Sequence, residues 1–163
     1  MGTHELAELA HGVAEIREDV IPYTSMGEPF DFRLRVPPTP ISRWVQAIWY
    51  AHGRAEYAEH VLPLSRVVLI VNLGDPHRLI SGTTRHRLDT AWIVGQQTRP
   101  YLSRVLGVTH AIGVVFEPDG AALFLRIPVS EATDEVVALD ESGEDWGTRL
   151  RESAAVVRSV EGV

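Results

Sequence analysis

The feature that most limits the fold is an alternation of apolar and polar residues through the middle of the chain, from Phe30 to Phe116. Between Phe30 and Val36 every second residue is apolar, which is typical of a strand with one buried face. Residues 67–71 are all apolar, which predicts a strand covered on both faces. Turn residues separate such segments throughout the region. The pattern predicts about seven or eight short strands in an antiparallel sandwich or barrel.

The other strands follow from the same pattern. Ser81-Gly82-Thr83 predicts the turn of one hairpin and Gly107 that of a second, because glycine tolerates the backbone angles of tight turns. Residues 30–117 are therefore predicted to form the β-barrel. Within it we expect further strands at residues 45–51, 78–80, 84–88, 91–94, 101–106 and 110–116.

A helix is predicted before the barrel. Apolar residues from Leu6 to Val20 recur every three or four positions, which indicates an amphipathic helix over residues 1–21, ended by Pro22. Its apolar stripe would either dock on its own barrel or pair with a second copy of the chain.

Helices are also predicted after the barrel. Asp119 can cap a short helix, and apolar residues from Trp146 to Val157 repeat at helical spacing. We therefore expect a single domain over residues 1–163, whose C-terminal part, residues 118–163, is helical.

Composition excludes several classes of protein. The net charge of −7 argues against nucleic-acid binding by this chain on its own, because phosphate binding needs a basic face. The absence of cysteine excludes disulfides, thiolate metal sites and a cysteine nucleophile. No basic start precedes an apolar run, as a signal peptide requires, and no apolar run reaches the roughly 18–20 residues of a membrane span. We expect a cytoplasmic protein that does not associate with membranes.

Three segments carry a family resemblance: residues 72–76 (Asn-Leu-Gly-Asp-Pro), 95–100 (Gly-Gln-Gln-Thr-Arg-Pro) and 113–122. In this order and spacing they resemble the N-terminal sensor and dimerisation half of arabinose-regulator-type (AraC) transcription factors. The resemblance implies a cupin-like β-barrel followed by helices. It also implies a following domain of two helix-turn-helix motifs, which we expect to be missing from these 163 residues.

Histidine spacing argues against a metal-dependent enzyme. Cupin enzymes hold their metal with a His-x-His pair, which places two imidazoles on one strand face. None of the seven histidines has a histidine partner two positions away. A turn at Ser81-Gly82 would set His77 opposite His86 and Arg78 opposite Arg85, whereas a turn at Gly82-Thr83 would remove both pairs.

No nucleophile elbow, P-loop or dinucleotide-binding fingerprint occurs either. We therefore predict no enzymatic activity, no catalytic or metal-ligating residues and no cofactor.

A ligand site would combine apolar walls with a few converging polar groups. Aromatic side chains would supply the walls, and polar side chains would supply hydrogen bonds. One of these polar side chains is an arginine, which can bind a carboxylate through two hydrogen bonds. The alternatives are plain core packing for the aromatics, a turn role for the asparagine and strand-end capping for the glutamines. The candidate ligand-binding residues are Trp49, Asn72, Trp92, Gln96, Gln97, Arg99 and Phe116.

The resemblance implies the regulatory domain of an AraC-type transcription factor, which would sense a small-molecule effector. We expect a homodimer built from one or both terminal helices, and no nucleic acid bound by this chain alone. The alternatives are a small cupin-like enzyme, which would show a metal or a deep polar site, and a ligand-free dimerisation module, which would show a filled barrel.

Overall fold

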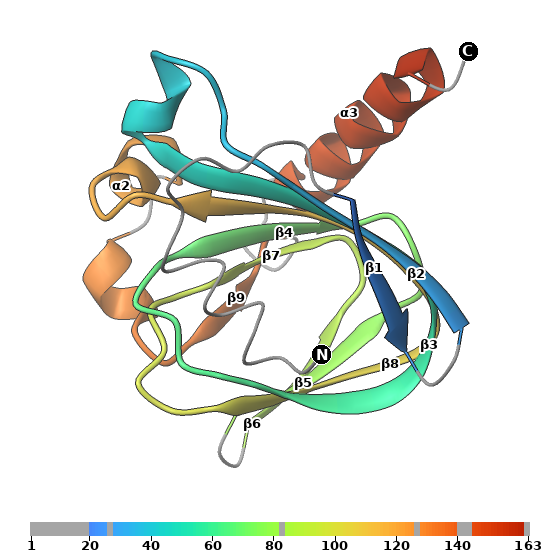
Figure 1. The fold of residues 1–163 in the computed structure, drawn as a ribbon. Coiled ribbons are helices and arrows are strands. Elements are labelled where there is room, and N and C mark those ends of the chain that lie inside the picture. Colours follow the sequence, from blue (N-terminus) through green and yellow to red (C-terminus); the bar gives the residue numbers. More distant parts are fainter. Residues whose placement is uncertain (1–19, 26–27, 82–83, 126–127, 140–144, 162–163) are drawn as a thin grey trace.

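The computed structural model describes residues 20–25, 28–81, 84–125, 128–139 and 145–161. The fold is mainly β, with few helices, as the alternation predicted. Its strands form one nine-stranded antiparallel sheet, in which β1-β2-β3-β8-β4-β7-β9 follow one another and the β5–β6 hairpin joins at β8. The sheet curls around an interior, as Figure 1 shows.

The strand bounds extend the predicted segments at several places. The strands are β1 (Val20–Ser25), β2 (Glu28–Arg35), β3 (Val45–Val61), β4 (Val68–Asn72), β5 (His77–Ser81), β6 (Thr84–Leu88), β7 (Ala91–Val94), β8 (Tyr101–Phe116) and β9 (Val136–Ala138). The helices are the short 3-10 turns η1 (Ile41–Arg43) and η2 (Val129–Ala132) and the α-helices α2 (Gly120–Phe124) and α3 (Trp146–Glu161).

Strand β8 organises the sheet because both of its edges are paired. One edge follows β3 from Phe116 to Tyr101. The other edge is divided: residues 102–105 pair with β5, and residues 111–115 pair with β4. Two wings therefore leave the same edge of β8, one made of β5 and β6 and the other of β4, β7 and β9.

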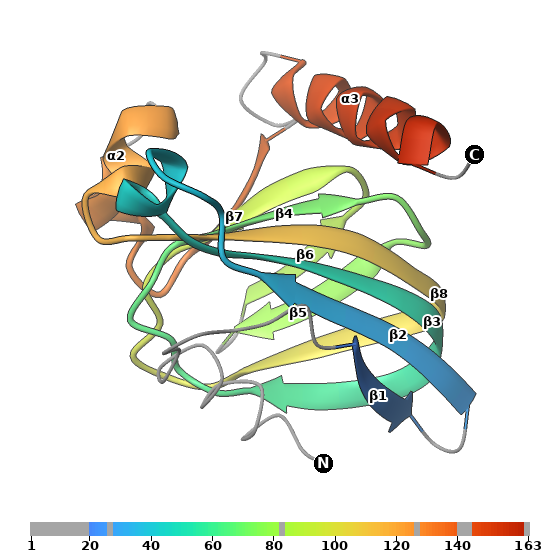
Figure 2. The same cartoon turned by 45° about the horizontal axis from the view of Figure 1, so that its top comes forward.

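Two apolar clusters lie on opposite faces of β4 and β7. The outer cluster is covered by the helices, since Leu150 and Ala154 of α3 pack against it and α3 contacts both β4 and β7 (Figure 2). Buried members of the outer cluster are Val45, Val67, Leu69, Val71, Ala91, Ile93, Phe116, Ala121, Leu125 and Leu139. Buried members of the inner cluster are Leu34, Ala47, Val68, Leu79, Leu88, Trp92, Val94, Tyr101, Val115 and Val136.

Three expectations about the elements need correction. The predicted turn at Gly107 is wrong: residues 101–116 form one strand, because β3 pairs with it continuously through the Ala55–Gly107 step. Strand β9 lies in the part predicted to be helical, where residues 136–138 pair with β7. Residues 1–19 of the predicted N-terminal helix lie outside the described residues, and residues 20–21 belong to β1.

The β5–β6 hairpin is present, and its register differs from the one that a turn at Ser81-Gly82 would give. Ser81 pairs with Thr84, and Arg78 pairs with Arg87. His77 therefore lies opposite Leu88, and the His77–His86 pairing is wrong.

Candidate functional site

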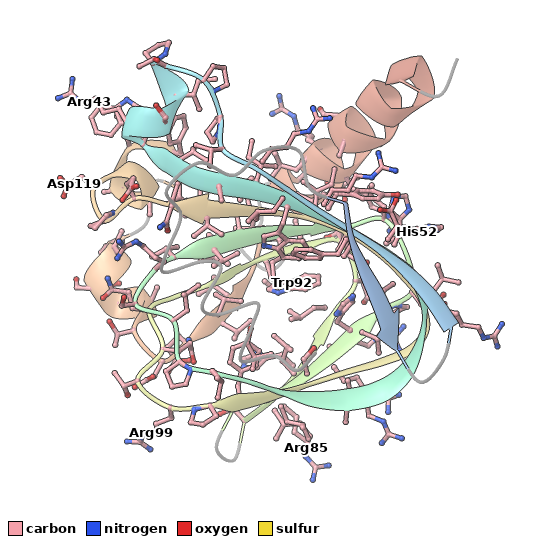
Figure 3. All side chains as sticks on the ribbon, viewed as in Figure 1. Arg43, His52, Arg85, Trp92, Arg99 and Asp119 are labelled. Atoms are coloured by element: carbon pink, nitrogen blue, oxygen red, sulfur yellow. The ribbon has the colours of Figure 1, made fainter. Side chains whose placement is uncertain are left out.

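The interior of the curled sheet holds the candidate site. Leu79 of β5, Trp92 of β7 and Tyr101 of β8 all belong to the inner cluster. Figure 3 places Trp92 inside the curl. Because side chains alternate along a strand, His77 lies on the same inward face of β5 as Leu79.

His77 and Trp92 meet across the two wings of the sheet. Their ring centroids lie 5.1 Å apart at an interplanar angle of 50°. His77 is 8% exposed and Trp92 is 1% exposed. Nε2 of His77 and Nε1 of Trp92 have no hydrogen-bond partner among the described protein groups. Buried polar atoms in folded proteins are nearly always paired, so these two nitrogens are available to a bound molecule.

Burial also fixes the charge of this site. Desolvation lowers the pKa of His77 from 6.5 to about 4, because the interior disfavours the charged imidazolium. His77 is therefore neutral near pH 7 and offers one donor and one acceptor, while the indole of Trp92 offers a donor only. The pair suits an uncharged molecule with a carbonyl or hydroxyl oxygen better than an anion.

Trp49 joins the same interior wall. Its indole lies over Gly113 on β8, where an added Cβ would be only 1.9 Å from Cε2 of Trp49. Phe32 stacks on Trp49 with ring centroids 6.1 Å apart. Trp49 and Trp92, two of the predicted wall residues, are therefore brought together in one cluster.

The third predicted wall residue lies elsewhere. Phe116 is buried in the outer cluster and stacks on Phe124 of α2, with ring centroids 5.9 Å apart. It is on the opposite side of the sheet from Trp92, since adjacent positions on β7 serve the two clusters. Phe116 therefore packs the helices onto the sheet.

Asn72 organises the loop between β4 and β5. Its amide nitrogen donates to the carbonyl oxygens of Asp75 (2.9 Å) and Asp89 (3.1 Å), and its side-chain oxygen accepts from the backbone N–H of Gly74 (3.1 Å). The side chain is fully buried. The amide proposed for a ligand is thus engaged with backbone groups, as the turn interpretation expects.

The glutamines fasten the loop after β7. The side-chain amide of Gln97 donates to the carbonyl oxygens of Gly95 (3.2 Å) and Glu135 (3.4 Å). The main-chain carbonyl oxygen of Gln96 accepts from the backbone N–H of Asp134 (2.8 Å). The hydrogen bonds to Glu135 and Asp134 tie this loop to the segment before β9. Arg99 is exposed on the same loop, and its position is marked in Figure 3.

Asp134 also holds the loop after β7 against the segment before β9. Its carboxylate accepts from the backbone N–H and from the hydroxyl of Thr98, each at 2.6 Å. These hydrogen bonds lower the pKa of Asp134. Asp134 has a positive φ of 59°, which Asp tolerates better than most residues. No motif in the sequence indicates this contact between positions 98 and 134.

From the sequence, His77 is considered only as a possible cross-strand partner of His86 and is not placed in the interior. His77 and Leu79 nevertheless share the period-two pattern of an inward strand face. That spacing was the available signal. Within the described ranges, no three His, Cys, Asp or Glu residues are grouped to hold a metal ion. None of the helices described is long and apolar enough to cross a membrane.

Among solved structures, the chain resembles the EutQ protein of Clostridium difficile, with 8% identity and a TM-score of 0.47 over 64% of this chain and 82% of that one. It also resembles vicilin from Corylus avellana (hazelnut), with 8% identity and a TM-score of 0.38 over 76% of this chain and 46% of that one. No curated protein matches the sequence. A family model matches residues 34–138, more than half of the chain. The chain belongs to the family described as "Domain of unknown function (DUF6597)".

Proposed function

We propose that this chain is the regulatory, ligand-sensing and dimerisation domain of an AraC-type transcription factor. The order and spacing of residues 72–76, 95–100 and 113–122 support the family assignment. The observation that carries the sensing role is the pair of buried nitrogens, Nε2 of His77 and Nε1 of Trp92, which have no hydrogen-bond partner among the described residues. The effector is a small, uncharged and mostly apolar molecule with a hydrogen-bonding oxygen.

The two wings of the sheet provide a mechanism. His77 lies on β5 and Trp92 on β7, and these strands belong to different wings. A ligand bonded to both side chains would favour one relative position of the wings and shift the population towards it. Because α3 contacts β4 and β7, the shift would reach the C-terminal helix. From there it would pass to the DNA-binding half of a longer protein.

Dimerisation is assigned to α3. One side of this helix, through Leu150 and Ala154, packs on its own sheet, while Arg149, Glu152 and Ser153 are exposed. We expect a homodimer, and light scattering at high micromolar concentration measures it directly. A monomer mass under those conditions would contradict the dimerisation role.

Ligand sensing is tested by thermal unfolding with uncharged fragments. The panel comprises benzamide, phenol and cyclohexanone, with benzoate as the charged comparison. At about ten times its Kd a ligand adds about 1.4 kcal/mol, which raises the Tm of a domain of this size by roughly 3–5 °C. We expect at least one uncharged fragment to do this at millimolar concentration, and benzoate to have a smaller effect.

Two histidine variants locate the binding. His77→Phe removes the interior imidazole, whereas the control His52→Phe removes one beside Tyr50 and His110 on β3 and β8. The fragment should stabilise the control and leave the Tm of His77→Phe unchanged. The fragments are tested up to about 10 mM, which is about ten times the Kd of a weak ligand that binds at about 1 mM. If none of them raises the Tm, the result favours the alternative of a ligand-free dimerisation module.

A further inference from the structure

Four arginines share the outer face of the β5–β6 hairpin and of the part of β8 that pairs with β5. In register, Arg78 of β5 lies opposite Arg87 of β6 on one side and opposite Arg104 of β8 on the other. Arg85 lies two residues before Arg87, and therefore on the same face of β6. All four side chains are exposed, and Arg85 projects away from the sheet in Figure 3. We call these four residues the arginine row.

Like charges directly opposite one another in a sheet are destabilising. Cross-strand neighbours have Cβ atoms about 5 Å apart, so Arg78 has a positive charge on both sides at this spacing. Arg87 has a carboxylate, that of Asp89, at 3.1 Å. Among the side chains that the structure describes, which do not include Glu56 and Glu59, no ion pair involves Arg78, Arg85 or Arg104. The chain has 22 acidic residues and a net charge of −7, so this concentration of positive charge is a local exception.

Protection of a free sheet edge against pairing with other chains explains only two of the four arginines in the row. Charged residues on an edge strand discourage pairing with other chains, and β6 is such a strand because it pairs with β5 alone. This accounts for Arg85 and Arg87. It does not account for Arg78 and Arg104, whose strands are paired on both edges.

We propose that the arginine row binds a compact anion that carries several linked phosphate groups. Guanidinium groups bind phosphate oxygens in a bidentate manner, and adjacent phosphates of one molecule would neutralise neighbouring arginines together. The site lies on the outer face of the sheet, opposite the face that carries His77, and is independent of the proposed effector site.

The net charge of the chain favours a compact partner over a long polyanion. The three arginines that pair in register, Arg87, Arg78 and Arg104, lie about 5 Å apart and so span about 10 Å, comparable to the Debye length at 0.1 M salt. A triphosphate stays within that distance, whereas DNA would extend beyond the row along an acidic protein. A strong DNA-binding surface makes roughly 6–10 phosphate contacts, more than four arginines supply.

Isothermal titration calorimetry of the full chain with inorganic tripolyphosphate tests the proposal. We expect saturable binding below 1 mM in 50 mM salt, with orthophosphate at least about tenfold weaker because it cannot bridge neighbouring arginines. ATP distinguishes the sources of the anion. Tighter binding of ATP than of tripolyphosphate identifies a nucleotide, and equal binding identifies the phosphate chain alone.

A matched pair of variants separates the row from general charge effects. Arg78→Gln/Arg104→Gln should weaken tripolyphosphate binding at least about tenfold, since both arginines of the pairing are lost. Arg43→Gln/Arg149→Gln removes the same charge from exposed positions on η1 and α3 and should change the Kd less than about twofold. The Tm of the first variant should equal or exceed that of the unchanged chain, because repulsion is relieved.

Three results would overturn the proposal. The first is no tripolyphosphate binding at 1 mM by a chain whose thermal unfolding shows that it is folded. The second is an equal loss of binding in the control variant, or equal binding of orthophosphate and tripolyphosphate. The third is tighter binding of a 12-nucleotide single-stranded DNA than of tripolyphosphate at 150 mM salt, which would make the row a nucleic-acid surface.

Discussion

Strand β7 serves two cores that have different compositions. Ala91 and Ile93 point into the outer cluster, which α2 and α3 close with apolar side chains. Trp92 and Val94 point into the inner cluster, where Trp92 meets the buried His77. Apolar side chains of the helices close the outer cluster, whereas the inner face holds two polar nitrogens that have no hydrogen-bond partner among the described residues. On the proposed function, the outer core would serve stability, and the inner face would give up some stability for binding.

The largest expected effect is on the outer core. Ile93 is 1% exposed, so Ile93→Ala leaves a cavity that the surrounding sheet and helix fill only in part. We expect a loss of about 3 kcal/mol in the free energy of unfolding, measured by urea denaturation. A loss below about 1 kcal/mol would mean that the helices cover the sheet loosely, and the contrast between the two cores would fail.

The inner face should respond to pH through His77. The pKa of 6.5 in the unfolded chain falls to about 4 on folding, so the unfolded state binds the proton more readily between these values. The stability associated with neutral His77 is therefore complete above pH 6.5 and is lost as the pH falls towards 4. The interval corresponds to about 3 kcal/mol.

The control for this prediction is His77→Phe, which has no group to protonate at that position. The free energy of unfolding of the unchanged chain minus that of His77→Phe, measured between pH 7 and pH 4, isolates the contribution of His77. A difference that does not vary with pH would show that the imidazole is solvated.

The sequence predicted the strands better than their pairing. Alternation located β2, the continuous apolar run of residues 67–71 located β4, and the turn signal at Ser81-Gly82-Thr83 located the β5–β6 hairpin. The prediction failed at Gly107, where the residue that suggested a turn has a φ of 133° and stays within one long strand. It also missed β9, whose three residues are held by pairing with β7, a contact that local sequence does not encode.

The candidate site was predictable in part for the same reason. Trp49 and Trp92 were expected in the wall because large aromatic residues on alternating strands face inward. Gln97 and Asn72 were expected there as polar groups, yet they bond backbone carbonyls across the loops. Whether a buried amide finds a backbone partner depends on the tertiary approach of distant segments, such as Asp89 to Asn72.

An overpacking substitution at Gly113 tests how tightly the side chains of the inner cluster are packed. Gly113→Ala places a Cβ 1.9 Å from the indole of Trp49, so the ring or the β8 backbone must shift. We expect a loss of about 2 kcal/mol in stability and a changed tryptophan fluorescence spectrum. An unaltered spectrum with unchanged stability would mean that Trp49 leaves this position at little cost.

The smallest expected change in stability is that of His77→Phe, and it distinguishes the inner face from the outer core most sharply. His77→Phe removes a buried unpartnered nitrogen from the inner face, and so removes a desolvation penalty while retaining an aromatic ring. At pH 7 we expect a stability within about 1 kcal/mol of the unchanged chain, or above it. A loss comparable to that of Ile93→Ala, measured in the same urea titrations, would show that the imidazole is a structural member of the core.

The central claim, that the inner face receives a ligand at His77 and Trp92, is tested most directly by the indole N–H signals in a ¹H–¹⁵N spectrum. The chain has four tryptophans, and Trp92→Phe identifies the Trp92 signal by its disappearance. During titration with the uncharged fragment that raises the Tm most, the Trp92 signal should move furthest and saturably, and this shift should be lost in His77→Phe. If the fragment raises the Tm while the Trp92 signal stays unchanged, the ligand binds elsewhere and the claim is contradicted.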